Sequence, residues 1–287
     1  MVELIGRHRV MTPQQIHTLL ARPGSRITNT YKTLRALRDE GLIATGPRRL
    51  FAPGFWYATE EGLRIAYANA ARQRHPWLFN PHSAHGLLKH TWLTNEIGSA
   101  FVAAAHATGD ECTWRSWDHE ITHGLDGGVL ITDAVLFYVG FTDNDVRALT
   151  YFVEVDRLTE SYDQVIEQLR RYARYATYAP IPQPGRPAPR GNGPHWRNRY
   201  ITFPTVLFVA GDEPDPDQPN RERSEQLRVE RVLSLAARDR DIASNISLLG
   251  TTFAAIARHG VTKAIWRTTN GPALVSCLDG KPQPTRS

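Results

Sequence analysis

The chain has 287 residues, of which 41% are hydrophobic and 22% charged, an ordinary globular composition that excludes a disordered or fibrous protein. Its two cysteines exclude a disulfide framework, and it has no apolar run long enough to span a bilayer. With no signal pattern at the N-terminus, we expect a cytoplasmic protein of two domains that does not enter a membrane.

The positive charge is concentrated at one end of the chain. Residues 1–74 hold twelve Lys and Arg against five Asp and Glu, whereas residues 75–287 hold twenty-two against twenty-four. The net charge of +5 therefore comes from the N-terminal quarter. A small basic module on a neutral body favours a polyanion as the partner of that module.

The N-terminal module has the pattern of a winged helix-turn-helix. Residues 12–15 form a clear helix start, with Thr12 as N-cap, Pro13 at the first helical position and Gln15 three residues after the cap. The predicted elements are helices over residues 3–9, 13–21 and about 28–41, and strands over 42–45 and 55–59. The two strands flank a basic turn at residues 46–49, which would form the wing.

If this module binds duplex DNA, the helix over 28–41 enters the major groove. Its N-terminal polar side chains would lie nearest the base edges, and the later basic side chains would lie on phosphates. The expected base-edge residues are Thr28, Asn29, Thr30 and Lys32, and the expected phosphate contacts are Arg35, Arg38, Arg48 and Arg49. The alternative is a winged helix that mediates protein contacts, with its basic residues forming a solvated face.

Pro- and His-containing stretches around residues 75–77 and 80–82 indicate a linker, which gives predicted domains of 1–75 and 76–287. A helix is predicted over 87–106. His85 and His90 near its start lack the spacing of a zinc motif, so structural or hydrogen-bonding roles are expected for them.

The most informative feature of the second domain is a pair of apolar strands that contain carboxylates. The predicted strands cover residues 129–139 and 151–156. Asp133 lies in the middle of the first, and Glu154 and Asp156 share a face of the second because strand side chains alternate. Burying a carboxylate costs several kcal/mol unless it is paired or binds a cation.

If the two strands pair, the three carboxylates converge and form a site for Mg²⁺ or Mn²⁺. The alternative is that these acids are edge-strand charges or partners of an arginine such as the adjacent Arg157. After the two strands, helices are predicted over 161–178 and 221–237, and strands over 203–209, 246–251 and 261–268.

This order of elements resembles the PD-(D/E)xK nuclease core, a mixed sheet flanked by helices in an α+β or α/β fold. Thr132-Asp133 matches its Pro-Asp step, and Glu154 matches the first acidic residue of its second step. The resemblance implies that Glu96, on the preceding helix, adds a further carboxylate. Asp156 stands where the family has lysine, which leaves open a second metal ligand or a degenerate, non-cleaving core.

Gln168 and Tyr172 on the following helix resemble the Q-x₃-Y motif of some members of that superfamily. The resemblance implies a place for both residues near a bound strand.

Across nearly its full length the chain is also similar to the replication-relaxation family of actinobacterial plasmids and integrative elements. The segments that carry this similarity are IGRHRVMTPQQIHTLL, TLRALRDEGLI, FWYATEEG, LKHTWLTNEI, ITDAVL, FVEVDRLTE and FPTVLFV. The similarity implies a role in replication, relaxation at an origin or mobilisation of plasmid or mobile-element DNA.

Three functions are therefore compared. The first is a metal-dependent DNA endonuclease or nickase, and the second is a non-catalytic regulator of double-stranded DNA whose body serves for docking or as a homodimer interface. The third is a relaxase-like enzyme with a tyrosine nucleophile. Tyr172, Tyr175 and Tyr178 lie along one helix, where they are more simply explained as packing residues.

Overall fold

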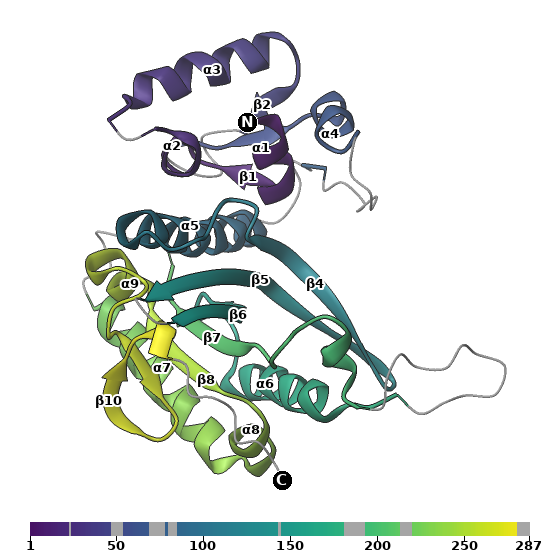
Figure 1. Ribbon diagram of the computed structural model, residues 1–287, viewed down its shortest axis with the longest axis vertical. Coiled ribbons are helices and arrows are strands. Elements are labelled where there is room, and N and C mark those ends of the chain that lie inside the picture. The colour runs from purple at the N-terminus through teal and green to yellow at the C-terminus, as the bar shows by residue number, and fades with distance from the viewer. Residues whose placement is uncertain are drawn as a thin grey trace, which may run out of the picture. The chain divides into compact units, whose positions relative to one another are not determined.

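The computed structural model of the chain describes residues 1–22, 24–46, 54–68, 78–79, 85–142, 145–180, 193–212 and 220–279 (Figure 1). Contacts within the chain divide it into two compact units, Met1–Asp118 and His119–Ser287. Among the described residues, no helix combines the length and the apolar character that crossing a membrane requires.

The elements of the first unit are α1 (Val2–His8), β1 (Val10–Met11), α2 (Pro13–Leu20), α3 (Ile27–Asp39), β2 (Ile43–Thr45), β3 (Trp56–Ala58), α4 (Glu60–Ala66) and α5 (His85–Thr108). The three helices and two strands predicted for the N-terminal module correspond to α1, α2, α3, β2 and β3, in the predicted order. β1, β3 and β2 form a small antiparallel sheet in that order. The two-residue strand β1 is too short to leave a pattern in the sequence, and it was not predicted.

The helix start predicted at residues 12–15 is confirmed. Thr12 Oγ1 accepts a hydrogen bond from the backbone N–H of Gln15 (3.2 Å), and Gln15 Oε1 accepts one from the backbone N–H of Thr12 (2.9 Å). This reciprocal capping satisfies two amide groups that the helix itself leaves without partners. It fixes where α2 begins, and α2 in turn supports α3.

The first unit extends well beyond residue 75, because α5 and the segment after it pack against the N-terminal elements. Asn95 of α5 is buried, and its Nδ2 donates to the backbone oxygens of His8 (3.0 Å) and Val10 (2.8 Å). The His8 ring stacks on Trp117 at 4.1 Å, and burial lowers the pKa of His8 to about 3. This compact unit therefore includes residues that the sequence analysis places in the second domain.

The second unit is built on a mixed sheet with the strand order β10-β9-β8-β7-β6-β5-β4 in the described part of the chain. Its elements are β4 (Trp117–Leu125, which begins at the unit boundary), β5 (Gly128–Thr142), β6 (Asp145–Asp156), α6 (Tyr162–Thr177), η1 (His195–Asn198), β7 (Thr205–Ala210), α7 (Arg221–Arg238), α8 (Arg240–Asn245), β8 (Leu248–Thr252), α9 (Phe253–His259), β9 (Trp266–Thr268), β10 (Gly271–Val275) and η2 (Cys277–Asp279). β5 and β6 pair antiparallel, which meets the condition on which the expected convergence of the carboxylates depends, whereas β6, β7 and β8 are parallel.

The main core of the second unit lies between the sheet and the helices α6, α7 and α8. Phe152 of β6 and Phe208 of β7 point into it and meet Tyr172 of α6 and Val229 of α7. Side chains two and four positions after Phe152 project to the same face of the sheet. Glu154 and Asp156 therefore lie on the face of β6 that the helices cover, and this places their carboxylates at the site described below.

β6 is longer than predicted. It begins at Asp145 rather than at residue 151, and its first six residues are mostly exposed. These first residues lack the apolar run from which the strand over residues 151–156 was predicted. The mixed sheet with flanking helices agrees with the predicted α+β class at this coarse level.

Candidate functional site

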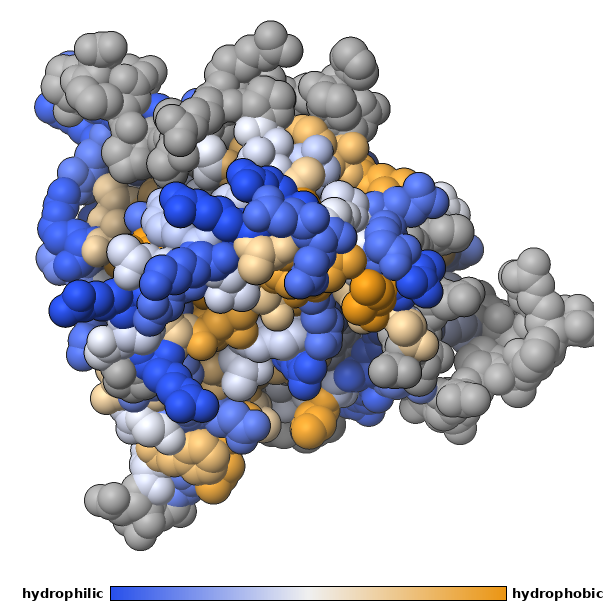
Figure 2. All heavy atoms as spheres, turned by 90° about the horizontal axis from the view of Figure 1, so that it is seen from above, coloured by the Kyte–Doolittle hydropathy of each residue, from blue (hydrophilic) through white to orange (hydrophobic). Residues whose placement is uncertain are grey.

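Helix α3 presents a polar face to solvent. Leu34 is fully buried beneath the helix, whereas Thr28, Lys32 and Arg35 are exposed. Residues spaced by four and three positions share one side of a helix, so these three form a single stripe. Neither Lys32 nor Arg35 forms an ion pair within the part of the chain that the structure describes. Figure 2 shows the molecule from above, where hydrophilic residues cover much of the described surface.

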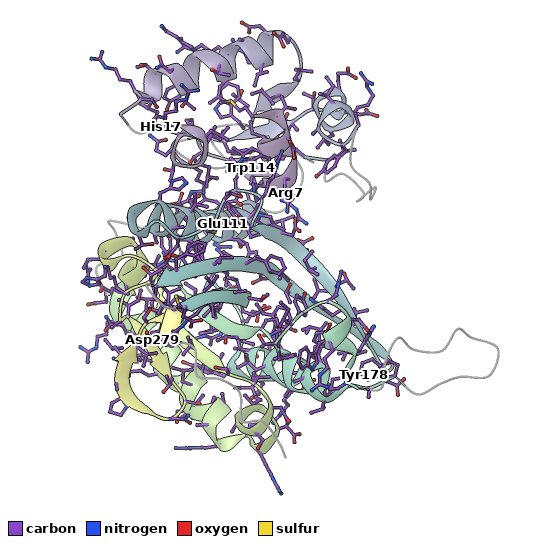
Figure 3. The ribbon with its side chains drawn as sticks, viewed as in Figure 1. Arg7, His17, Glu111, Trp114, Tyr178 and Asp279 are labelled. Carbon is purple, nitrogen blue, oxygen red and sulfur yellow. The ribbon has the colours of Figure 1, made fainter. Side chains whose placement is uncertain are left out.

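Thr30 does not belong to this exposed stripe. Its side chain is buried, and its Oγ1 lies 2.9 Å from Nδ1 of His17 on α2, which Figure 3 labels. A hydroxyl held between two helices cannot reach a base edge. The structure therefore corrects the predicted role of Thr30, which joins α3 to α2, while its neighbour Asn29 is exposed as predicted.

Of the remaining predicted DNA contacts, the structure describes Arg38 but neither Arg48 nor Arg49. Arg38 is exposed and pairs with its neighbour Asp39, with Nη2 and Oδ1 2.9 Å apart. An exposed pair of this kind contributes about 0–1 kcal/mol, so the guanidinium can exchange its partner at little cost. The predicted wing residues Arg48 and Arg49 lie outside the described residues.

In the second unit, Asp133 and Glu154 lie side by side on β5 and β6. The register pairs Ala134 with Val153, which places Asp133 opposite Glu154 on the same face of the sheet. Asp133 Oδ2 accepts a hydrogen bond from the backbone N–H of Val155 at 2.8 Å. The convergence predicted for these two carboxylates is thus present in the fold.

Helix α6 completes the surroundings of this carboxyl pair. Tyr172 donates its hydroxyl hydrogen to Oε1 of Glu154. Gln168, one helical turn earlier, donates from Nε2 to the backbone oxygen of Ile131 at 3.0 Å, and its side chain also contacts Glu154. The structure therefore brings together four predicted residues: Asp133, Glu154, Gln168 and Tyr172.

Burial and the nearby Asp133 raise the pKa of Glu154 well above its ordinary value, although the Tyr172 hydroxyl lowers it in part. Burial and the negative charge of Glu154 likewise raise the pKa of Tyr172 far above its usual range. Tyr172 therefore stays protonated and acts as a hydrogen-bond donor. Tyr172 and Tyr175 are both fully buried in the core, which agrees with the packing role expected for them.

Asp156 does not join the other two carboxylates. It is buried, and Nε of Arg228 on α7 donates to its Oδ2, while its Oδ1 accepts from the backbone N–H of Leu158 at 2.7 Å. Arg228 also donates to the backbone oxygen of Glu160 at 2.7 Å. Asp156 is thus neutralised by a guanidinium. This agrees with the alternative interpretation that these acids are partners of an arginine, although the arginine is Arg228 rather than Arg157.

The predicted site of three converging carboxylates is therefore not formed. No group of three or more His, Cys, Asp and Glu is arranged to hold a metal ion within the described residues. Glu96 lies on α5 in the first unit, where burial raises its pKa and the side chains of Gln15 and Trp92 hydrogen-bond to it. Its place beside Asp133 stays a prediction.

A family model described as replication-relaxation matches residues 2–186 of the chain. The chain belongs to the replication-relaxation family. The matched residues of this replication-relaxation protein include the exposed face of α3 and the whole Asp133–Glu154 carboxyl pair with its helix α6. Arg228, which neutralises Asp156, lies beyond them. Neither the comparison with curated proteins nor that with solved structures gave a match.

Sequence reasoning missed Arg228 as a partner of the acidic strand. It lies 72 residues after Asp156, on a helix with many charged residues. One signal was available, because Arg228 falls among the apolar positions of α7, next to Val229 and at helical spacing from Val232. A charged residue on the apolar side of a helix usually has a buried partner.

Proposed function

We propose that this replication-relaxation protein binds double-stranded DNA through α3 and acts in the replication or relaxation of plasmid or mobile-element DNA. The observation that carries the proposal is the exposed stripe of α3, whose cations Lys32 and Arg35 have no acidic partner in the described part of the chain. Family membership and the basic excess of the N-terminal quarter support it.

In this proposal α3 lies in the major groove of the duplex. Thr28, Asn29 and Lys32, near the N-terminal end of the helix, reach base edges, and Arg35 and Arg38 contact phosphates. Thr30 holds the helix to α2 through His17 and sets its angle on the scaffold. Hydrogen bonds to bases give sequence preference, whereas the phosphate contacts give affinity that falls as salt rises.

Replacing both Lys32 and Arg35 with alanine is expected to weaken duplex binding at least about 30-fold, because each of the two lost contacts costs about 1–3 kcal/mol and about 1.4 kcal/mol corresponds to a factor of ten. The affinity for a DNA duplex from the plasmid or mobile element that encodes the protein would be measured by fluorescence anisotropy at several salt concentrations. The matched control is Arg64→Ala with Arg115→Ala, which removes the same charge from exposed positions elsewhere in the first unit. Equal affinities of the two double variants would contradict the proposal.

A second candidate is metal-dependent cleavage of that DNA at the Asp133–Glu154 carboxyl pair. Two adjacent carboxylates offer the hard oxygen ligands that Mg²⁺ and Mn²⁺ prefer, and their mutual repulsion is relieved when a cation lies between them. A bound cation would supply Lewis-acid stabilisation of a phosphate oxygen. The chain itself would hold Glu154 in place through the Tyr172 hydroxyl.

If this second candidate is correct, wild-type protein nicks or linearises supercoiled plasmid with Mg²⁺ or Mn²⁺, and Glu154→Gln abolishes the nicking while DNA binding persists. Glu167→Gln, on the exposed side of α6, is the matched control and should retain the activity. If the wild type gives no cleavage with either metal, the protein acts as a non-catalytic DNA-binding accessory protein.

A further inference from the structure

A groove in the second unit lies along helix α7, between that helix and the segment from β8 to β10. It consists of two hollows of about 640 Å³ and about 340 Å³, and Arg267 of β9 lines both. We call the two hollows together the α7 groove. The described residues that line it all follow residue 220 and therefore lie outside the part of the chain that the family model matches.

Cations outnumber acids along the α7 groove. Arg258 of α9, Lys263, Arg267 and Arg238 line it, against two glutamates of α7. One of these, Glu222, pairs with Arg258 at 2.8 Å, and the other, Glu230, pairs with Arg267 at 3.3 Å. Within the described residues, Lys263 and Arg238 form no ion pair, so the groove carries an excess of positive charge.

The two ion pairs do not prevent an anion from entering. All four side chains are more than a third exposed, and exposed pairs of this kind are screened by solvent and exchange their partners readily. A phosphate can replace a glutamate on Arg258 or Arg267, because guanidinium binds both groups through two parallel hydrogen bonds. Up to four cations are therefore available to a ligand that brings several negative charges.

The shape of the α7 groove favours an extended ligand. Its lining runs from Glu222 to Arg238 along α7, which at 1.5 Å per residue is about 24 Å. A small anion would occupy one hollow, whereas a chain with regularly repeated charges can contact Lys263 and Arg238 together. No Phe, Tyr or Trp side chain is among the described residues that line it, so the large aromatic rings on which bases usually stack are not provided there.

We propose that the α7 groove binds the phosphodiester backbone of a nucleic-acid strand, with Lys263 and Arg238 as its main phosphate contacts. The groove would recognise the negative charge of the phosphates and would have no preference for base sequence. This second contact does not depend on α3, and it would let one protein hold a second stretch of nucleic acid.

Lysine footprinting offers a direct test, because the sequence has only four lysines. Full-length protein would be acetylated with and without a single-stranded or duplex oligonucleotide, and modification at each lysine quantified by mass spectrometry. We expect Lys263 to be protected several-fold relative to Lys89 of α5. This protection should persist in the Lys32→Ala/Arg35→Ala variant. Protection of Lys263 by polyglutamate but by neither oligonucleotide would overturn the proposal and indicate an acidic protein partner.

The salt dependence of binding gives a second, quantitative test. Lys263→Ala with Arg238→Ala should reduce the steepness of log K against log salt by about 1.8 for duplex or about 1.4 for a single strand. The matched control, Arg223→Ala with Arg231→Ala, removes the same charge from exposed positions outside the groove. Equal slopes of the two variants on both kinds of DNA would overturn the proposal.

The outcomes separate this inference from the proposed role of α3. A slope altered only by the groove variant supports the α7 groove and removes α3 as a DNA contact. A slope altered only by the Lys32→Ala/Arg35→Ala variant supports α3 as a DNA contact and overturns the proposal for the α7 groove.

Discussion

Replacing Arg228 with methionine is expected to lower the free energy of unfolding by about 3–5 kcal/mol, because it leaves the buried Asp156 without its counter-charge. Asp156 is 5% exposed and cannot regain water without opening the sheet. The guanidinium also lies over the Tyr162 ring, 4.4 Å from its centroid, and methionine loses that contact as well. The loss would be measured by urea unfolding at neutral pH.

The control for this variant is Arg231→Met, an exposed arginine of the same helix, which should change stability by less than about 0.5 kcal/mol. A double variant, Arg228→Met with Asp156→Leu, tests the cause of the loss. Replacing both charges with apolar side chains removes the unpaired carboxylate, so most of the lost stability should return. If the single variant is as stable as Arg231→Met, Arg228 does not neutralise Asp156.

The sequence predicted the features that follow from local rules. Alternation along the second strand placed Glu154 and Asp156 on one face, and pairing of the two strands, which the structure contains, places Asp133 opposite Glu154 on that face. The reciprocal cap at Thr12 and Gln15 was readable for the same reason, because both partners lie within one helical turn.

What could not be predicted depends on contacts between distant segments. Alternation says that Asp156 shares a face with Glu154, but not that Arg228 of α7 lies opposite, so the sequence cannot distinguish a metal ligand from an ion-pair partner. Thr30 was predicted as a base contact because it is one of the N-terminal polar residues of the helix expected to enter the major groove, yet its side chain is buried beside His17 of α2. Both corrections come from a second helix whose position no local pattern gives.

The extent of the first unit also depends on contacts between segments that are distant in the sequence. Pro- and His-containing stretches around residues 75–77 and 80–82 predicted a boundary near residue 75. The Asn95 amide and the stacking of His8 on Trp117, however, join α5 and residues up to Asp118 to the N-terminal elements. Through Asn95, α5 therefore holds the backbone at the end of α1 and the start of β1. The domain boundary near residue 75 stays a prediction.

The acid–base behaviour of Glu154 gives the last prediction. Burial and Asp133 raise its pKa well above the ordinary value of 4.5, so the folded protein binds this proton more tightly than the unfolded chain does. The stability gained from the proton is complete below the unfolded pKa and is lost as pH rises through the folded pKa. Each unit of difference between these two pKa values amounts to about 1.4 kcal/mol.

Glu154→Gln keeps an oxygen for the Tyr172 hydroxyl and removes the titration. Without metal, the variant is therefore expected to gain stability relative to wild type as pH rises from about 4 to about 8, measured by urea unfolding at each pH. Glu167→Gln, on the exposed side of α6, is the control and should show no such trend. A constant difference between Glu154→Gln and wild type across this range would show that Glu154 binds its proton equally in the folded and unfolded states, which contradicts a raised pKa in the folded protein.

Repeating these measurements with Mg²⁺ separates the two ways in which the carboxyl pair can be neutralised. A cation between Asp133 and Glu154 would replace the proton, so wild type should recover stability at about pH 8 while Glu154→Gln gains little. If Mg²⁺ and Mn²⁺ leave both proteins unchanged, the pair is a protonated hydrogen-bonding element of the core. The Tyr172–Glu154 contact then serves to anchor α6 on the sheet, and cleavage at this site is excluded.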